Sequence, residues 1–113
     1  MEKKYIKIET TGKVAELVVT EESEYSDLSG AVQGVLEMVP SIFEDHYLYL
    51  NEEGKLIGLE INELATSLAN GLSSYDIIVG DVVIVGPLDE EGNHLSVTPE
   101  VLGRLTMSSN DKA

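Results

Sequence analysis

Apolar and polar residues alternate with a period of two near the start of the chain. The segment 5–9 alternates, Thr11 and Gly12 interrupt the pattern, and the segment 14–19 resumes it. Alternation is typical of strands with one buried face, and a short glycine turn between two such strands is typical of a β-hairpin. We therefore expect an N-terminal hairpin.

The apolar spacing becomes helical between residues 23 and 33. The apolar positions there are Tyr25, Leu28, Ala31 and Val32. Ser23 stands where it can cap the start of a helix, and Gly34 stands where a left-handed residue would end it. A short strand at 36–39, closed by Pro40, is expected to follow.

A second hairpin is predicted around residues 51–54. The flanking segments 46–50 and 55–59 are rich in aromatic and aliphatic residues, and Gly54 can supply the positive φ of a turn with a bulge. Asn62 can then cap a helix. The inward residues of this helix would be Leu64, Ala65 and Leu68, before a stop at Asn70 and Gly71.

Four consecutive β-branched residues at 82–85 predict a buried central strand. A strand at 77–79 is expected just before it, and Asp81 between the two either pairs inside the fold or ends a turn. After a turn at 89–93, Thr98 and Pro99 give the N-cap and first position of a last helix.

This order of elements predicts an α+β fold. We expect one domain over residues 1–106, with a mainly antiparallel sheet of five to six strands and two to three short helices, followed by a flexible C-terminal tail at 107–113. A chain of 113 residues with 42% hydrophobic residues has enough apolar material for one core.

The charge of the chain limits its partners. Residues 14–103 hold 18 acidic residues against one basic residue, Lys55, and the net charge of the whole chain is −14. Such a field opposes direct binding to nucleic acid or to anionic membranes and favours cationic partners. Cysteine is absent, and neither a signal peptide nor a membrane-spanning stretch is predicted, so we expect a cytoplasmic protein.

The chain resembles an uncharacterised family of small proteins found in phages, conjugative elements and Gram-positive bacteria. The residues that carry this resemblance are Val35–Pro40, Asn51–Leu59, Asn62 with Ala65, Asp76–Gly86 and Thr98–Glu100. The family has no established activity. The resemblance therefore implies a mobile-element setting, in which small acidic proteins often block host nucleases or defence systems.

No motif for catalysis, metal binding or cofactor binding is present. The only histidines are His46, at a strand start, and His94, in a turn, and no nucleophile elbow accompanies them. The acidic turns at 51–54 and 89–93 lack the glycine position of a calcium loop. No phosphate loop occurs. We therefore expect a protein that acts by binding, with no catalytic residue, metal or cofactor.

The leading hypothesis is an acidic accessory protein that binds a basic host protein. Its partner-binding residues would be Glu21, Glu22, Glu24, Asp27, Glu52, Glu53, Asp89, Glu90 and Glu91, with Tyr47 and Tyr49 as aromatic anchors. Clustering of these acids on one face would favour mimicry of DNA, and a spread around the molecule would oppose it.

Two alternatives remain open. The chain can be an oligomer that holds a nucleotide-sized ligand, with Tyr47, Tyr49 and Tyr75 stacking on the base. It can also be a structural phage component that self-assembles through a strand edge, for which the segment 5–9 is the first candidate.

Overall fold

A five-stranded sheet in the order β2-β1-β5-β4-β3 organises the protein, and every neighbouring pair of strands is antiparallel. The structure is a computed structural model that describes residues 2–70 and 76–110, without the side chains of residues 107–110. The elements are β1 (Glu2–Ile8), β2 (Val14–Thr20), α1 (Glu24–Val32), β3 (Leu36–Pro40), β4 (Tyr47–Asn51), α2 (Glu63–Leu68), β5 (Val82–Val85) and α3 (Pro99–Asn110). The predicted α+β class is confirmed.

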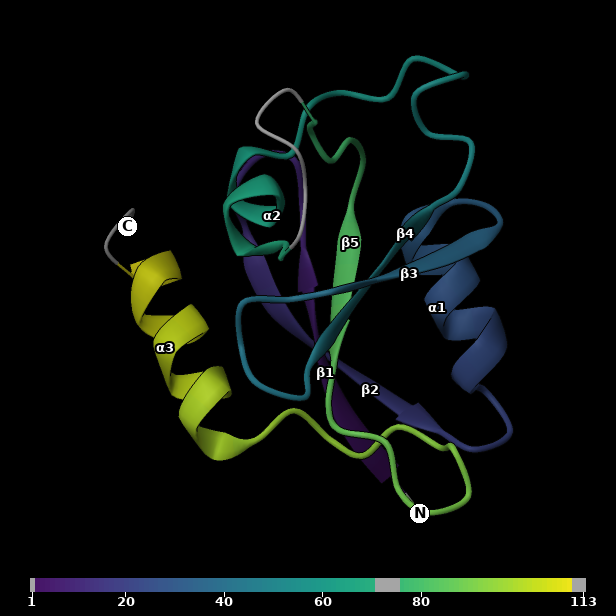
Figure 1. The fold of residues 1–113 in the computed structure, drawn as a ribbon, viewed down its shortest axis with the longest axis vertical. Coiled ribbons are helices and arrows are strands. Elements are labelled where there is room, and N and C mark those ends of the chain that lie inside the picture. Colours follow the sequence, from purple (N-terminus) through teal and green to yellow (C-terminus); the bar gives the residue numbers. More distant parts are fainter. Residues whose placement is uncertain (1, 71–75, 111–113) are drawn as a thin grey trace.

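Helices cover both faces of the sheet, with α1 on one side and α2 and α3 on the other (Figure 1). The central strand β5 shows why both faces are apolar. Val83 and Val85 pack towards Leu28 and Ala31 of α1, and the alternate residues Val82 and Ile84 pack into the core that α2 and α3 cover. All four residues of β5 are buried. The predicted central strand is therefore confirmed.

The N-terminal hairpin is also confirmed, but its first strand is not an edge. Strand β1 lies between β2 and β5, so the expectation that residues 5–9 form an exposed edge is wrong. Val82–Val85 is too apolar to lie at an edge, and it pairs with β1 through Ile6 and Ile8. The edges of the sheet are β2 and β3.

The end of α1 differs from its prediction by one residue. Gln33, with φ of 65°, is the left-handed residue, and Gly34 is required for another reason. A Cβ atom at Gly34 would lie 2.5 Å from Asn51 Nδ2. At the start of the helix Ser23 holds the N-cap position, but its Oγ accepts from Thr20 N at 2.9 Å and caps no helix amide.

The predicted second hairpin is wrong. Residues 47–51 form β4, but β3 and β5 already pair with its two edges. The segment 55–59 therefore has no strand to join and folds into turns, closed by a hydrogen bond from Ile57 N to Glu53 O at 3.1 Å. Gly54 has no positive φ. A Cβ there would lie 2.9 Å from Val79 Cγ2, so close packing explains this glycine.

Residues 77–79 do not form a strand, and Val79 makes only an isolated bridge with Ile61. The cap on α2 is confirmed. Asn62 Oδ1 accepts from Ala65 N at 3.0 Å, and Nδ2 donates to Ile8 O at 3.0 Å and Gly80 O at 2.9 Å. Asn62 therefore ties α2 to β1 and to the turn before β5.

The last helix begins at Pro99, as predicted, and extends to Asn110. It therefore includes the first four residues of the expected tail, and residues 111–113 lie outside the described part of the chain. Asp81 has internal partners: its carboxylate accepts from Thr10 N at 3.0 Å and lies 3.9 Å from Lys7 Nζ. Within residues 2–70 and 76–110, no helix is long and apolar enough to cross a membrane.

Candidate functional site

A polar cluster links α1 to the sheet. Glu24 Oε1 accepts from Lys3 Nζ at 2.6 Å, and Glu24 Oε2 accepts from Tyr5 OH at 2.6 Å. Lys3 Nζ also donates to His94 O at 3.0 Å. Because its carboxylate is used on both oxygens, Glu24 serves as an internal connection, although the sequence suggested a partner-binding role.

Tyr49 and His94 form a second part of this cluster. His94 is buried, and its Nδ1 lies 3.1 Å from Gly86 O while its Nε2 lies 2.9 Å from Tyr49 OH. The carbonyl oxygen can only accept, so Nδ1 carries the proton and Nε2 accepts from the tyrosine. The Tyr47 ring lies 5.8 Å from the His94 ring. Both tyrosines are half-buried against the core and are therefore not exposed anchors.

Tyr5, which is buried, and the half-buried Tyr49 both resist ionisation. Burial raises the pKa of Tyr5, and the hydrogen bond to Glu24 and the charge of Glu24 raise it further. Burial also raises the pKa of Tyr49, with a smaller contribution from the Glu24 charge. Phenol groups held in their neutral form contribute hydrogen bonds here, so we assign this cluster a role in docking α1 on the sheet.

His46 is likewise buried with both ring nitrogens in use. Its Nδ1 lies 2.8 Å from Glu44 O, and its Nε2 accepts from Thr98 N at 3.2 Å. Thr98 Oγ1 lies 3.5 Å from the same nitrogen. Both nitrogens of each histidine therefore contact other groups of the fold. Among residues 2–70 and 76–110, no group of three or more His, Asp or Glu residues is placed to hold a metal ion.

A cavity of about 260 Å³ opens beside the polar cluster, and we call it the acidic pocket. Its lining residues are Glu2, Lys3, Glu21, Asp89, Glu91, Asn93, His94, Leu95 and Ser96. Glu21 precedes α1, whereas Asp89 and Glu91 lie in the turn after β5. The fold therefore brings two of the acidic groups in the sequence, at 21–27 and at 89–91, to one opening.

Hydrogen bonds to Asp89 close the turn at 89–93. Asp89 Oδ1 accepts from Asn93 N and from Glu91 N, each at 2.9 Å. These backbone donors, that of Asn93 first, lower the pKa of Asp89. Asp89 therefore stays ionised in the turn, and Glu90 and Glu91 beside it are exposed.

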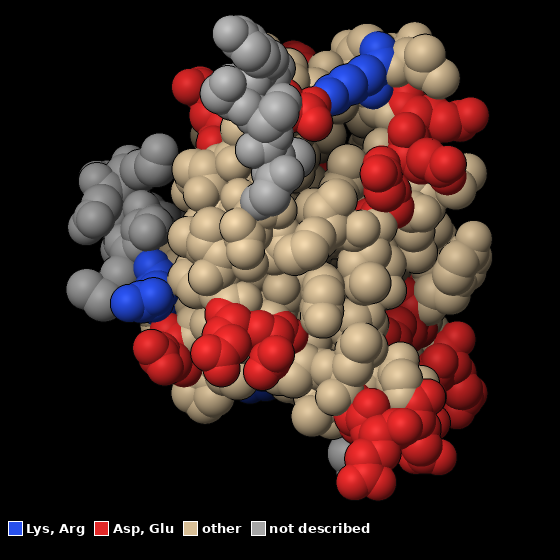
Figure 2. All heavy atoms as spheres, viewed as in Figure 1, with Lys and Arg blue, Asp and Glu red and all other residues tan. Residues whose placement is uncertain are grey.

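On the face shown in Figure 2, the acids do not form one continuous surface. Figure 2 shows them as separate groups near the margin of one face, with a broad uncharged area between the groups. Glu52 and Glu53 are exposed, and Glu52 lines a different cavity that shares no residue with the acidic pocket. Glu22 is exposed and Asp27 is half-buried, and neither lines the acidic pocket.

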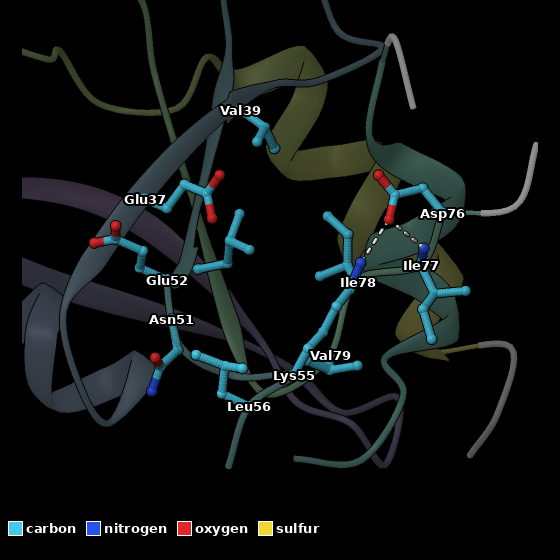
Figure 3. A pocket seen from close by; sticks show the side chains of 11 residues that line it. Glu37, Val39, Asn51, Glu52, Lys55, Leu56, Asp76, Ile77, Ile78 and Val79 are labelled. Carbon is cyan, nitrogen blue, oxygen red and sulfur yellow. Dashed lines mark hydrogen bonds and ion pairs between the residues drawn. The ribbon is translucent and has the colours of Figure 1, made fainter. Parts of the chain in front are cut away.

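The second cavity, which we call the edge cavity, measures about 150 Å³ and lies beside β3 (Figure 3). Its lining residues are Glu37, Val39, Leu50, Asn51, Glu52, Lys55, Leu56, Asp76, Ile77, Ile78 and Val79. Lys55 Nζ binds Asp76 Oδ1 at 2.5 Å. This hydrogen bond, more than the charge of Lys55 itself, lowers the pKa of Asp76. Glu37 and Glu52 lie on the opposite side of the cavity (Figure 3).

Sequence analysis did not anticipate the edge cavity. Its walls come from β3, from the end of β4 and the turns after it, and from residues 76–79. The sequence had predicted a hairpin strand at 55–59 and a separate strand at 77–79. The short strand ending at Pro40 was the available signal, because proline is confined to sheet edges. Tyr75, proposed to stack on a base, lies outside the described residues.

The comparisons with known proteins place the chain in an uncharacterised domain family. No curated protein and no solved structure matches this chain. The profile of a domain of unknown function, DUF3846, matches residues 3–108. That match spans all five strands except the first residue of β1, and nearly all of α3. The chain therefore belongs to the DUF3846 family.

Proposed function

We propose that this protein is a non-enzymatic accessory protein of a phage or mobile element that binds a basic host protein through the acidic pocket. The binding would inhibit a host defence or DNA-processing factor. The observation that carries the proposal is the acidic pocket itself, because it joins Glu21 to Asp89 and Glu91 from a distant part of the sequence.

The charges at this opening support a cationic partner. Lys3, the basic residue of the pocket, is already paired with Glu24. Four acidic residues, Glu2, Glu21, Asp89 and Glu91, line the pocket together with this one lysine. A recess lined by one sign of charge focuses the field and attracts ions of the opposite sign. Arginine or lysine side chains of a partner fit this field.

The separated acids in Figure 2 favour a local contact of this kind. Mimicry of a DNA backbone would need a continuous row of carboxylates, with about one charge per 1.7 Å along the axis. We therefore propose that the partner inserts a few basic side chains at the acidic pocket. If the partner has a nucleic-acid-binding groove, this protein does not fill the whole of it.

The test compares two charge-reversed variants with the same change in net charge. The variant Glu21→Lys with Glu91→Lys changes the acidic pocket, and Glu44→Lys with Glu60→Lys, at exposed positions that line neither the acidic pocket nor the edge cavity, is the matched control. Each tagged protein is incubated with host extract at low salt, and bound proteins are identified by mass spectrometry. We expect the wild type and the control to retain a basic protein that high salt releases, and the pocket variant to lose it.

Equal loss in both variants would show attraction by net charge alone and would contradict a pocket-specific contact. Retention by both variants would remove the acidic pocket from the interface. Melting temperatures are measured for all three proteins, because exposed substitutions usually change stability by about 0.5 kcal/mol or less. Loss of binding with an unchanged melting temperature is the supporting result.

A further inference from the structure

The outer edge of β3 carries backbone groups that have no strand partner among residues 2–70 and 76–110. Hydrogen bonds join Glu52 N to Val35 O just before β3 and Ser41 N to His46 O just after it. Val35 and Ser41 are therefore hydrogen-bonded positions of the pairing between β3 and β4. Hydrogen-bonded positions alternate in an antiparallel pair. The N–H and C=O groups of Glu37 and Val39 therefore point towards β4, and those of Leu36 and Met38 point outwards.

Other described segments leave this edge open. Pro40 has no N–H, and its carbonyl oxygen accepts from Asn70 N at 2.9 Å, so the segment 68–70 occupies the edge at Pro40. At Leu36 and Met38, no backbone partner occurs within residues 2–70 and 76–110. Glu37 and Met38 are exposed. The available edge is thus about three residues long and ends at a defined point.

The edge cavity lies on the face of the sheet that carries the Glu37 and Val39 side chains (Figure 3). A volume of about 150 Å³ holds one small ring or aliphatic group, as an engineered cavity of that size holds benzene. The walls combine aliphatic side chains with the carboxylates of Glu37 and Glu52, and neither carboxylate has an ion pair or hydrogen bond in the described chain. Lys55 is already neutralised by Asp76.

We propose that β3 accepts an extended cationic segment of a partner protein as a sixth strand, with one lysine or arginine side chain entering the edge cavity. Strand addition supplies affinity through main-chain hydrogen bonds, and side-chain pockets supply specificity. The aliphatic stem of the basic residue would pack on the apolar wall, and its charged head would reach Glu37 and Glu52.

Charge selects this occupant over a second copy of the chain. Two β3 strands side by side would bring their Glu37 side chains together, and like charges opposite each other destabilise a sheet. Each copy also carries a net charge of −14. The inference shares a cationic partner with the proposed function, but it uses residues outside the acidic pocket, so each can fail alone.

The first probe is a capped peptide of three Lys-Val repeats, with a capped peptide of three Glu-Val repeats as its matched control. Amide exchange is followed by NMR at increasing peptide concentration. We expect the Lys-Val peptide to slow exchange at Leu36 and Met38 about tenfold or more, and the Glu-Val peptide to leave both amides unchanged. A Lys-Val peptide with N-methyl groups on alternate residues should also leave them unchanged.

Two substitutions test the backbone contact from the side of the protein. Met38→Pro removes an outward N–H and keeps the bonds of β3 with β4, and proline is tolerated on edge strands. Met38→Ala shortens the same side chain and keeps the N–H. We expect Met38→Pro to weaken peptide binding about tenfold and Met38→Ala to weaken it less than threefold. The N-methylated peptide tests the same contact if Met38→Pro does not fold.

Several results would overturn the proposal. These are equal binding of the Glu-Val peptide, no slowing at millimolar Lys-Val peptide, and protection of the β2 edge in place of Leu36 and Met38. Protection of Leu36 and Met38 in the free protein, together with a doubled mass in solution, would identify a second copy as the occupant.

Discussion

At the scale of single residues, the buried Asn51 holds a segment that has little regular structure of its own. Asn51 Nδ2 donates to Val32 O at 3.2 Å and Gln33 O at 3.1 Å, and its Oδ1 accepts from Glu53 N at 2.8 Å. One side chain therefore satisfies the end of α1 and the turn after β4. Gly34 allows this contact, because a Cβ there would overlap the amide group.

We predict that Gly34 and Asn51 are energetically coupled. Gly34→Ala should destabilise the wild type by about 1–3 kcal/mol, because it displaces a buried side chain and leaves polar groups unpaired. In an Asn51→Ala background the same substitution should cost less, because the clash is gone. Urea unfolding of the two single variants and the double variant measures the coupling. Additive effects would contradict the contact, and Asn93→Ala at an exposed position is the control.

At the scale of elements, α1 is held on the sheet by polar contacts as well as by its apolar face. Leu28, Ala31 and Val32 are buried, and Glu24 in the first turn binds Lys3 and Tyr5 of β1. From the sequence alone, Glu24 was indistinguishable from its acidic neighbours Glu21 and Glu22. Glu24 has a different role because the tertiary structure places Lys3 and Tyr5 of β1 next to the start of α1.

This arrangement predicts a loss of stability at alkaline pH. Because the pKa of Tyr5 and that of Tyr49 are raised in the native state, the native protein keeps protons that the unfolded chain loses above about pH 10. The stabilisation is complete below that pH and falls as pH rises through it, by up to about 1.4 kcal/mol per pH unit for each tyrosine.

Urea unfolding between about pH 8 and pH 11 checks this dependence. Tyr5→Phe should reduce the slope of unfolding free energy against pH, because phenylalanine does not ionise. Tyr25→Phe is the matched control, since Tyr25 is 71% exposed, and it should leave the slope as in the wild type. Identical slopes for Tyr5→Phe and the wild type would argue against proton retention at Tyr5.

At the scale of the whole molecule, a net charge of −14 is distributed over a body of 36 × 31 × 25 Å. Three salt bridges involve described lysines, namely Lys3 with Glu24, Lys7 with Asp81 and Lys55 with Asp76. Most acids therefore repel one another through solvent. Repulsion of this kind keeps a protein soluble and lowers the stability of its compact state.

We predict that salt stabilises the protein. Added NaCl shortens the screening length from about 30 Å at 0.01 M to about 3 Å at 1 M, so the melting temperature should rise by several degrees across this range. A variant with Glu52, Glu53, Glu90 and Glu91 changed to glutamine, with its net charge reduced from −14 to −10, should show a smaller rise. A melting temperature that falls with salt would mean that attractive ion pairs dominate.

Local patterns in the sequence determined the fold class, the N-terminal hairpin, the helix after Ser23, the Asn62 cap and the buried strand at 82–85. These features depend on near neighbours: alternation, helical spacing and capping act within a few residues. The acidic composition, and with it the expectation of a cationic partner, was also available without a structure.

Beyond the N-terminal hairpin, tertiary structure alone decided which strand neighbours which. Strands β3 and β5 occupy both edges of β4, so the segment 55–59 had no edge to join, although its pattern suggested a strand. The same pairing brought Glu21 to the turn at 89–93, made Glu24 internal, buried His94 beside Tyr49 and left β3 open at the edge. Each of these outcomes depends on contacts between residues far apart in the chain, which no local pattern encodes.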